Sequence, residues 1–178
     1  QKALKKNLQI TNNLDDISSC NIFIVTVPTP IDKNKDPDFK PLLDVCKKIS
    51  KLLKNGDIIV FESTVYPGAT EEICAKELEK NKSSLKSGVD FFLGYSPERV
   101  NPGDKKRTID KINKVISGQN KKVETILFDI YSKLTKGEIF LAKNIKVAEA
   151  SKVIENAQRD INIAFINEVA KICSKLNI

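Results

Sequence analysis

The sequence contains no histidine, no tryptophan and no methionine. Without histidine, catalysis by an imidazole and metal sites with histidine ligands are excluded. The four cysteines form no Cys-x-x-Cys pair and no cluster, so we expect no metal site. None of the seven glycines stands two positions from another, which excludes a Gly-x-Gly phosphate-binding turn within this chain.

Long apolar runs and a signal peptide are also absent, so the sequence predicts no membrane association and no export. We expect the cysteines to be buried free thiols in a reducing, cytoplasmic setting. The net charge of +7 comes from scattered lysines without interleaved aromatic residues, which argues against nucleic-acid binding. Because the chain opens on Gln1 and has no methionine, we expect it to be a piece of a longer protein.

Short apolar runs alternate with stretches of helical periodicity along the chain. Strands are predicted at residues 21–27, 57–61, 89–93, 114–117 and 138–141. Helices are predicted from Pro41 to the Asn55-Gly56 stop, at about 70–80, at 123–134 and from about 146 to the end. This alternation is typical of an α/β fold with a parallel sheet covered by helices on both faces.

Each of the first three predicted strands ends in a polar motif. Pro-Thr-Pro follows the first strand, Glu-Ser-Thr the second and Ser-Pro-Glu-Arg the third. Because parallel strands share one direction, we expect these motifs along one edge of the sheet, where α/β proteins bind ligands. Proline and serine are also common in ordinary turns, but three such motifs on one edge favour a ligand site.

The last predicted helix carries Lys152, Asn156 and Arg159 within roughly 60° of one another, at about 100° per residue. An ammonium, an amide and a guanidinium on one stripe can hold an oxyanion or a phosphorylated ligand. Only three of the thirty basic residues are arginine, so an arginine here indicates a need for its planar donor pair. The alternative is a solvated helix face with Lys152 paired to Glu149 or Glu155.

Four longer motifs follow one another along the chain. They are V-P-T-P (27–30), E-S-T-V-Y-P-G-A-T (62–70), Y-S-P-E-R-V-N-P-G (95–103) and A-E-A-S-K-V-I-E-N-A-Q-R-D-I-N-I-A-F-I-N-E (148–168). In order and spacing they resemble the UDP-glucose/GDP-mannose dehydrogenase family, over nearly the whole chain. Within it, they look most like the bacterial UDP-N-acetyl-D-glucosamine (hexosamine) 6-dehydrogenases of capsule, O-antigen and Vi-antigen biosynthesis.

The resemblance implies an NAD-dependent enzyme that oxidises C6 of a UDP-sugar to a carboxylate in two steps, through a cysteine-bound thioester. It implies that Thr29 and Thr64 contact NAD, with Thr64 also near the hydrolytic water. It assigns Glu98 to the cofactor site as the acid–base group for thioester hydrolysis. A carboxylate in a partly dry cleft suits that task, although Glu98 paired with Arg99 and Thr64 bonded to backbone are plainer readings.

The remaining roles implied by the resemblance concern the substrate. Arg99 and Val100 would line the substrate site, and Arg159 would reach the nucleotide sugar. Lys152 would stabilise the developing oxyanion and exchange protons, with Asn156 beside it. These residue types suit the reaction, since an oxygen that gains negative charge needs a cation or a donor nearby.

Two parts of the family pattern have no counterpart here, the glycine-rich first βαβ unit and the segment with the nucleophilic cysteine. We therefore expect an α/β fold with a partial Rossmann-like parallel sheet, followed by a long α-helix. Residues 1–141 would be the C-terminal part of an NAD-binding domain, and residues 142–178 the central helix that starts the middle domain. The full-length protein would be the enzyme, and this piece alone would be inactive.

Several alternatives stay open. UDP-glucose, UDP-N-acetylmannosamine and GDP-mannose enzymes are rivals within the family, and a non-catalytic nucleotide-sugar-binding or dimerisation module is a rival of another class. A nucleic-acid binder is the weakest rival. The long helix also carries an apolar stripe, which predicts a homodimer. The stripe consists of Ile154, Ile161, Phe165, Val169 and Ile172.

Overall fold

Five strands form one sheet in the computed structural model, which describes residues 8–80, 84–99 and 110–178. The strands lie side by side in chain order: β1 (Ile22–Val25), β2 (Ile58–Phe61), β3 (Phe92–Tyr95), β4 (Lys114–Gly118) and β5 (Ile139–Leu141). The helices are η1 (Leu14–Ile17, a 3₁₀ turn), α2 (Lys40–Leu52), η2 (Thr70–Cys74), α3 (Ala75–Lys80), α4 (Lys121–Leu134) and α5 (Ile145–Leu176). The predicted α/β fold with a long final helix is confirmed.

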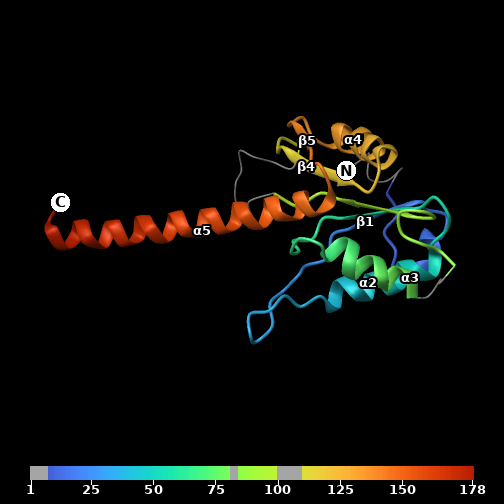
Figure 1. The fold of residues 1–178 in the computed structure, drawn as a ribbon, viewed down its shortest axis with the longest axis horizontal. Coiled ribbons are helices and arrows are strands. Elements are labelled where there is room, and N and C mark those ends of the chain that lie inside the picture. The colour runs from blue at the N-terminus through green and yellow to red at the C-terminus, as the bar shows by residue number, and fades with distance from the viewer. Residues whose placement is uncertain (1–7, 81–83, 100–109) are drawn as a thin grey trace.

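Helices cover both faces of the sheet, with α2 and α3 on one side and α4 on the other (Figure 1). Successive side chains of a strand point to opposite faces. In β2, Ile59 and Phe61 therefore pack in the larger core with α2 and α3, whereas Ile58 and Val60 pack with α4. All four side chains are buried, which explains why this strand is a continuous apolar run in the sequence.

The direction of the strands changes once across the sheet. β1, β2 and β3 are parallel, and so are β4 and β5, but β3 and β4 are antiparallel. A parallel pair needs a crossover, usually a helix, and the sequence predicts no helix between the third and fourth strands. The three strands that carry the polar motifs run in one direction, as the sequence predicted.

The third strand begins later than the sequence predicts, at Phe92 instead of Val89. Val89 is exposed and lies in a turn that Asp90 closes. The backbone N–H of Asp90 donates to the Lys86 carbonyl, and the Asp90 carboxylate accepts from the Lys86 N–H, both at 2.8 Å. Such local bonds compete with strand pairing, so the strand is displaced toward Tyr95.

The predicted helix at 70–80 forms in two parts. Its first turn, η2, is π-helical, and α3 continues it. Gly68 precedes this turn with φ of +100°, a conformation that glycine adopts without a Cβ penalty. Single π-helical turns often lie near functional sites, and no feature of the sequence pattern predicted this one.

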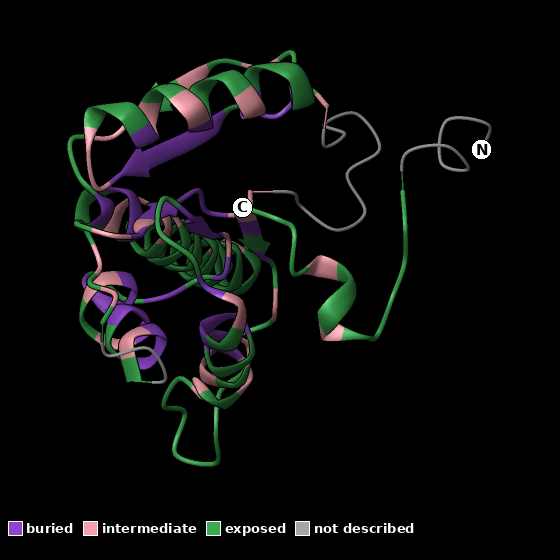
Figure 2. Cartoon of the chain, turned by 90° about the vertical axis from the view of Figure 1, so that its right-hand side faces the viewer, coloured by how far each residue is buried: buried purple, intermediate pink, exposed green. Residues whose placement is uncertain are grey.

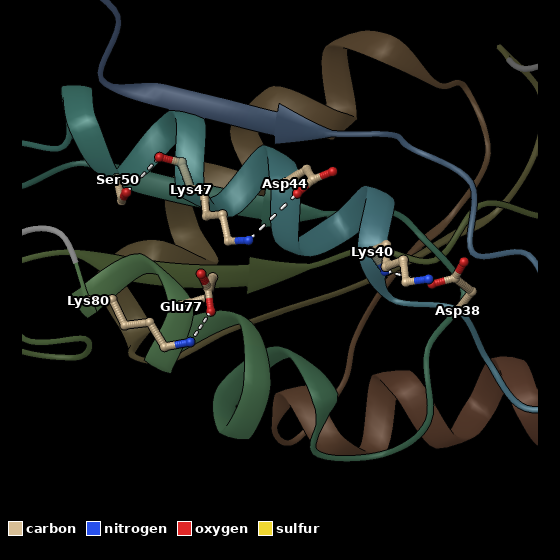
Figure 3. A network of polar contacts seen from close by, with 7 residues as sticks. All are labelled: Asp38, Lys40, Asp44, Lys47, Ser50, Glu77 and Lys80. Carbon is tan, nitrogen blue, oxygen red and sulfur yellow. Dashed lines mark hydrogen bonds and ion pairs between the residues drawn. The ribbon is translucent and has the colours of Figure 1, made fainter.

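Polar side chains lie at the start of α2 and form pairs along its exposed side (Figure 3). The Asp38 carboxylate accepts from the Lys40 N–H at 2.9 Å, which stabilises the start of the helix. Lys47 and Asp44 form an exposed pair at 3.8 Å, and such pairs contribute little to stability. The helix ends earlier than predicted, at Leu52, and its C-cap Leu53 is extended (φ −55°, ψ 133°), so the predicted left-handed cap at Asn55-Gly56 is wrong. Gly56, at φ +88°, lies instead in the turn that leads to β2.

α5 runs for 32 residues and projects away from the sheet (Figure 1). Its buried residues are Ile145, Ala148 and Glu149, all in the first two turns. Most of the remaining helix is exposed (Figure 2). None of the helices in the described ranges combines the length and the apolar character that a bilayer crossing requires.

The four cysteines are free thiols in different surroundings. Cys46 and Cys74 are buried between α2 and η2, Cys20 is exposed and Cys173 is partly exposed. A hydrogen bond with Cys74, together with burial, raises the pKa of the Cys46 thiol, so it stays protonated and unreactive. The prediction of buried free thiols is confirmed for Cys46 and Cys74 and is wrong for Cys20, which is exposed.

Candidate functional site

A pocket of about 410 Å³ lies where β1, β2 and β3 end. The loops after these strands line it with Thr26, Val27, Pro28, Thr29, Glu62, Ser63, Thr64 and Glu98. All three polar motifs that the sequence placed on one edge therefore contribute to one pocket. The parallel direction of the strands brings Thr29, Thr64 and Glu98 together from loops that are distant in the sequence.

Hydrogen bonds hold the three loops side by side beyond the strand ends. The Ser63 hydroxyl donates to the Val27 carbonyl at 2.5 Å, and the Glu98 N–H donates to the Glu62 carbonyl at 3.2 Å. The buried Tyr95 hydroxyl donates to the Ser63 carbonyl at 3.1 Å. These bonds continue the pairing of the strands into the loops, so the loops that form the rim of the pocket extend the sheet.

Thr29 contributes an unsatisfied polar atom to this pocket. Its hydroxyl oxygen is buried and has no hydrogen-bond partner among the described residues. A buried group left in this state costs about 1–3 kcal/mol, which a ligand hydrogen bond would recover. This feature fits a polar ligand such as a dinucleotide. Thr64 lines the same pocket with an exposed side chain.

Glu98 lies partly buried at the third side of the pocket. One carboxylate oxygen, Oε1, accepts a hydrogen bond from the backbone N–H of Arg99 at 2.6 Å. Glu98 is therefore a local partner of Arg99, as the plainer interpretation expected. The contact does not remove Glu98 from the pocket, because the side chain is still among its lining residues.

Lys152 is half-buried on α5, one turn beyond the buried residues. Burial lowers the pKa of its ammonium group; Glu155 and Glu98 oppose this effect, whereas Arg159 and Arg99 reinforce it. A lysine with a lowered pKa releases and takes up a proton more readily at neutral pH than an exposed one. The interaction with Glu98 also indicates that Lys152 lies within electrostatic reach of the pocket.

Glu155 connects the two arginines of the predicted substrate site. Its Oε2 lies 2.9 Å from Arg99 Nη2, and its Oε1 accepts from Arg159 Nη2 at 2.8 Å. Glu149 accepts from two backbone N–H groups. Both carboxylates that the sequence offered as partners of Lys152 are therefore engaged by other groups.

The residues on α5 do not line the pocket at the strand ends. Arg99 and Glu155 line a second pocket of about 390 Å³, together with Lys111, Ile112 and Asn113. Arg159 borders a further surface hollow on α5. Asn156 is exposed one turn after Lys152, and Val100 lies outside the described residues. From the sequence we expected the strand-end motifs and the Lys152 stripe to border a single cleft. The structure instead separates a strand-end region from a helix region, and the two meet at Glu98 and Arg99.

A largely buried network at the pocket consists of Glu62, Lys114 and Tyr131. None of the three was a predicted site residue, although Glu62 belongs to the Glu-Ser-Thr motif. Lys114 Nζ lies 3.3 Å from Glu62 Oε1, and the Tyr131 hydroxyl donates to the same oxygen at 2.5 Å. Burial, together with the Glu62 charge, raises the pKa of Tyr131, so its hydroxyl remains a donor. The available signal was a lysine at the start of an otherwise apolar strand, since buried lysines need a partner.

An α/β sheet with helices on both faces and a pocket at the carboxyl ends of its parallel strands defines a Rossmann-like domain. The chain belongs to the UDP-glucose/GDP-mannose dehydrogenase family, because residues 1–135 match the family's NAD binding domain and residues 146–178 its central domain. The resemblance carried by the four motifs is confirmed.

Several relatives match nearly the whole chain. The UDP-N-acetyl-D-glucosamine 6-dehydrogenase of Pseudomonas aeruginosa is 53% identical over 171 residues, which cover 96% of this chain and 40% of that protein. The Salmonella typhi enzyme of the same name is 46% identical with the same coverage. The solved structure of a UDP-D-ManNAc dehydrogenase from Pyrococcus horikoshii superposes with a TM-score of 0.85 at 34% identity, covering 94% of this chain and 39% of that one. The chain spans about 40% of the length of the curated relatives.

Proposed function

We propose that this chain is part of an NAD-dependent nucleotide-sugar 6-dehydrogenase that serves surface-polysaccharide biosynthesis. The enzyme oxidises a UDP-N-acetylhexosamine to the uronic acid in two NAD⁺-dependent steps. The observation that carries the proposal is the gathering of Thr29, Thr64 and Glu98 around one pocket, with Lys152 in electrostatic reach. Family membership and likeness to UDP-N-acetyl-D-glucosamine 6-dehydrogenases support it.

Thr29 and Thr64 are the cofactor-binding residues in this proposal. The buried Thr29 hydroxyl has no partner within the described part of the chain, and a polar group of NAD⁺ would satisfy it. Bound NAD⁺ supplies the hydride acceptor. Thr64, on the next loop of the same pocket, adds a hydroxyl beside the cofactor and the hydrolytic water.

Lys152 supports the oxidation of the sugar alcohol. When the C6 hydroxyl loses its proton, negative charge develops on the oxygen, and a preorganised ammonium stabilises it. The lowered pKa of Lys152 lets the same group take up and return that proton. Asn156, one turn along α5, adds an amide donor, while Arg99 and Arg159 offer guanidinium groups to the nucleotide sugar.

Glu98 is the base of the second stage, in which water releases the acid. Its contact with the Arg99 N–H orients the carboxylate at the pocket wall. A carboxylate in a partly enclosed pocket can take a proton from water and later return it. Glu98 and Lys152 thus serve different stages, hydrolysis and hydride removal, from neighbouring regions of one site.

The test is NADH formation by the full-length protein with UDP-GlcNAc, UDP-GalNAc, UDP-Glc and UDP-ManNAc. We expect the highest kcat/KM with one of the two UDP-N-acetylhexosamines of the gluco or galacto series. Preference for UDP-Glc or UDP-ManNAc would move the protein to another branch of the family. Absence of NADH with every sugar would favour the non-catalytic binding module.

The proposal includes a homodimer formed through α5. The apolar stripe is exposed along the helix, with Ile161 at 66% and Phe165 at 64% exposure. Contiguous apolar surface of this kind marks an interaction site. We expect Phe165→Glu to shift the full-length protein toward monomer in sedimentation equilibrium, and Lys171→Glu on the same helix to leave the association unchanged. Equal association of both variants and the wild type would contradict the interface.

The domain division and the location belong to the same proposal. The family matches at residues 1–135 and 146–178 support a boundary near residue 141 between the cofactor domain and the central helix. The free, buried thiols Cys46 and Cys74 support a reducing, cytoplasmic location.

A further inference from the structure

Glu149 is fully buried at the start of α5. Its two carboxylate oxygens accept hydrogen bonds from the backbone N–H groups of Gly68, at 2.5 Å, and Thr70, at 2.9 Å. These donors lie in the segment that leads from Thr64 into η2, about eighty residues earlier in the chain. One buried side chain therefore joins the long helix to the loop after β2.

The same carboxylate also lies near the end of β3. Burial is the largest cause of the raised pKa of Tyr95, and the negative charge of Glu149 is the next largest. The Tyr95 hydroxyl donates to the carbonyl of Ser63, the residue before Thr64. Glu149 is thus connected to the Thr64 loop in two ways. It bonds directly to the Gly68 and Thr70 amides, and its charge acts on Tyr95, which bonds to Ser63.

We infer that Glu149 is a positioning residue that holds the Thr64 loop and the Lys152 helix in one fixed relation. Lys152 follows Glu149 by three residues, less than one helical turn, so any slide or rotation at the start of α5 moves its ammonium group. Thr64 precedes Gly68 by four residues along the anchored segment. The inference rests on the proposed function, because that function assigns Thr64 and Lys152 to one reaction.

A second polar contact also joins α5 to η2, but its side chains are exposed to solvent, whereas Glu149 is buried. Lys146 on α5 pairs with Glu72 on η2 at 2.6 Å, with side chains that are 53% and 58% exposed. Water replaces such a pair at little cost. Loss of the Glu149 acceptor instead leaves two enclosed N–H groups without partners. Glu72 is therefore a matched control for Glu149.

The experiment is a double-mutant cycle in the full-length enzyme, with Glu149→Gln, Lys152→Ala and the combined variant. A glutamine has the same shape but only one oxygen, and its NH₂ group would face a backbone donor. We expect Glu149→Gln to lower kcat by about 10- to 100-fold at temperatures where it is folded, because small displacements of reacting groups cost up to ~10²-fold. In the Lys152→Ala background the same change should cost less than about threefold, since the group it positions is gone.

Glu72→Gln should leave kcat within about twofold of wild type, as expected for an exposed pair. Additive effects in the cycle, or equal losses for Glu149→Gln and Glu72→Gln, would overturn the inference and leave the proposed function standing. An inactive wild type with every sugar would refute the proposed function itself. If Glu149→Gln does not fold, Glu149→Asp, which keeps the charge but withdraws it by one methylene, takes its place in the same cycle with the same criteria.

Discussion

The two ends of α5 differ sharply although they belong to one continuous helix. At its start, Ile145 and Ala148 are at most 1% exposed, and Glu149 bonds to the loop after β2. Farther along, Ile154 and Phe165 are 66% and 64% exposed. The apolar periodicity is similar in both parts, so periodicity alone does not tell which residues pack within the chain and which await another surface.

The comparison also separates two roles. In the proposed enzyme the start of the helix holds Lys152 within electrostatic reach of Glu98 and Arg99, and the exposed length is the proposed surface for association. We expect changes near the start to affect catalysis and the stability of the chain. Changes farther along should affect assembly and leave the chemistry and the fold intact.

The largest effect is expected for Lys152→Ala in the full-length enzyme. Loss of the ammonium that we propose stabilises the developing oxyanion should lower kcat by about 10²–10³-fold. Lys171→Ala, which removes an exposed lysine paired with Glu168 on the distal part of the helix, is the control and should stay within about twofold. Unchanged catalysis in Lys152→Ala would remove its assigned role.

A smaller effect, on stability, should distinguish the same two parts of the helix. Ile145→Ala removes a fully buried side chain and should lower the free energy of unfolding by about 2–5 kcal/mol. Ile154→Ala removes an exposed side chain and should change it by less than about 0.5 kcal/mol. Equilibrium denaturation of the 178-residue chain, at concentrations where it is monomeric, measures both. Equal losses would show that the exposed part is also packed within the chain.

The smallest effect concerns pH and the exposed pair at the start of α5. The hydrogen bond from Lys146 lowers the pKa of the Glu72 carboxyl below its ordinary value of 4.5. A lowered pKa in the folded state means that the pair stabilises the fold above this ordinary value and that the contribution is lost as the pH falls through the lowered one. We expect acid to lower the Tm slightly more in wild type than in Glu72→Gln. If acid lowers the Tm equally in wild type and in Glu72→Gln, the pair contributes nothing to stability.

Much of the fold could be predicted because local patterns decide it. The apolar run from Ile58 to Phe61 must be covered on both sides, and the prolines and glycines mark where helices begin and end. The later start of β3 and the antiparallel direction of β4 were not predictable in this way. Side-chain bonds of Asp90 decide the first, and the pairing of strands distant in sequence decides the second.

The same distinction, between local pattern and contacts of distant segments, applies to the residues of the candidate site. Thr29, Thr64 and Glu98 could be grouped because parallel strands necessarily end at one edge. The network of Glu62, Lys114 and Tyr131 could not, since a lysine on β4 meets a glutamate after β2 only when the sheet has formed.

The sequence by itself determined the family, the α/β layering and the order of the strand-end motifs, because these follow from periodicity and from residue types at close spacing. Only the tertiary structure decided which carboxylates are buried and what they bind. Glu149 and Glu155 lie on one helix six residues apart, yet the first holds two backbone N–H groups and the second two arginines. The difference comes from what packs against each face of the helix, and that is a property of contacts between distant segments.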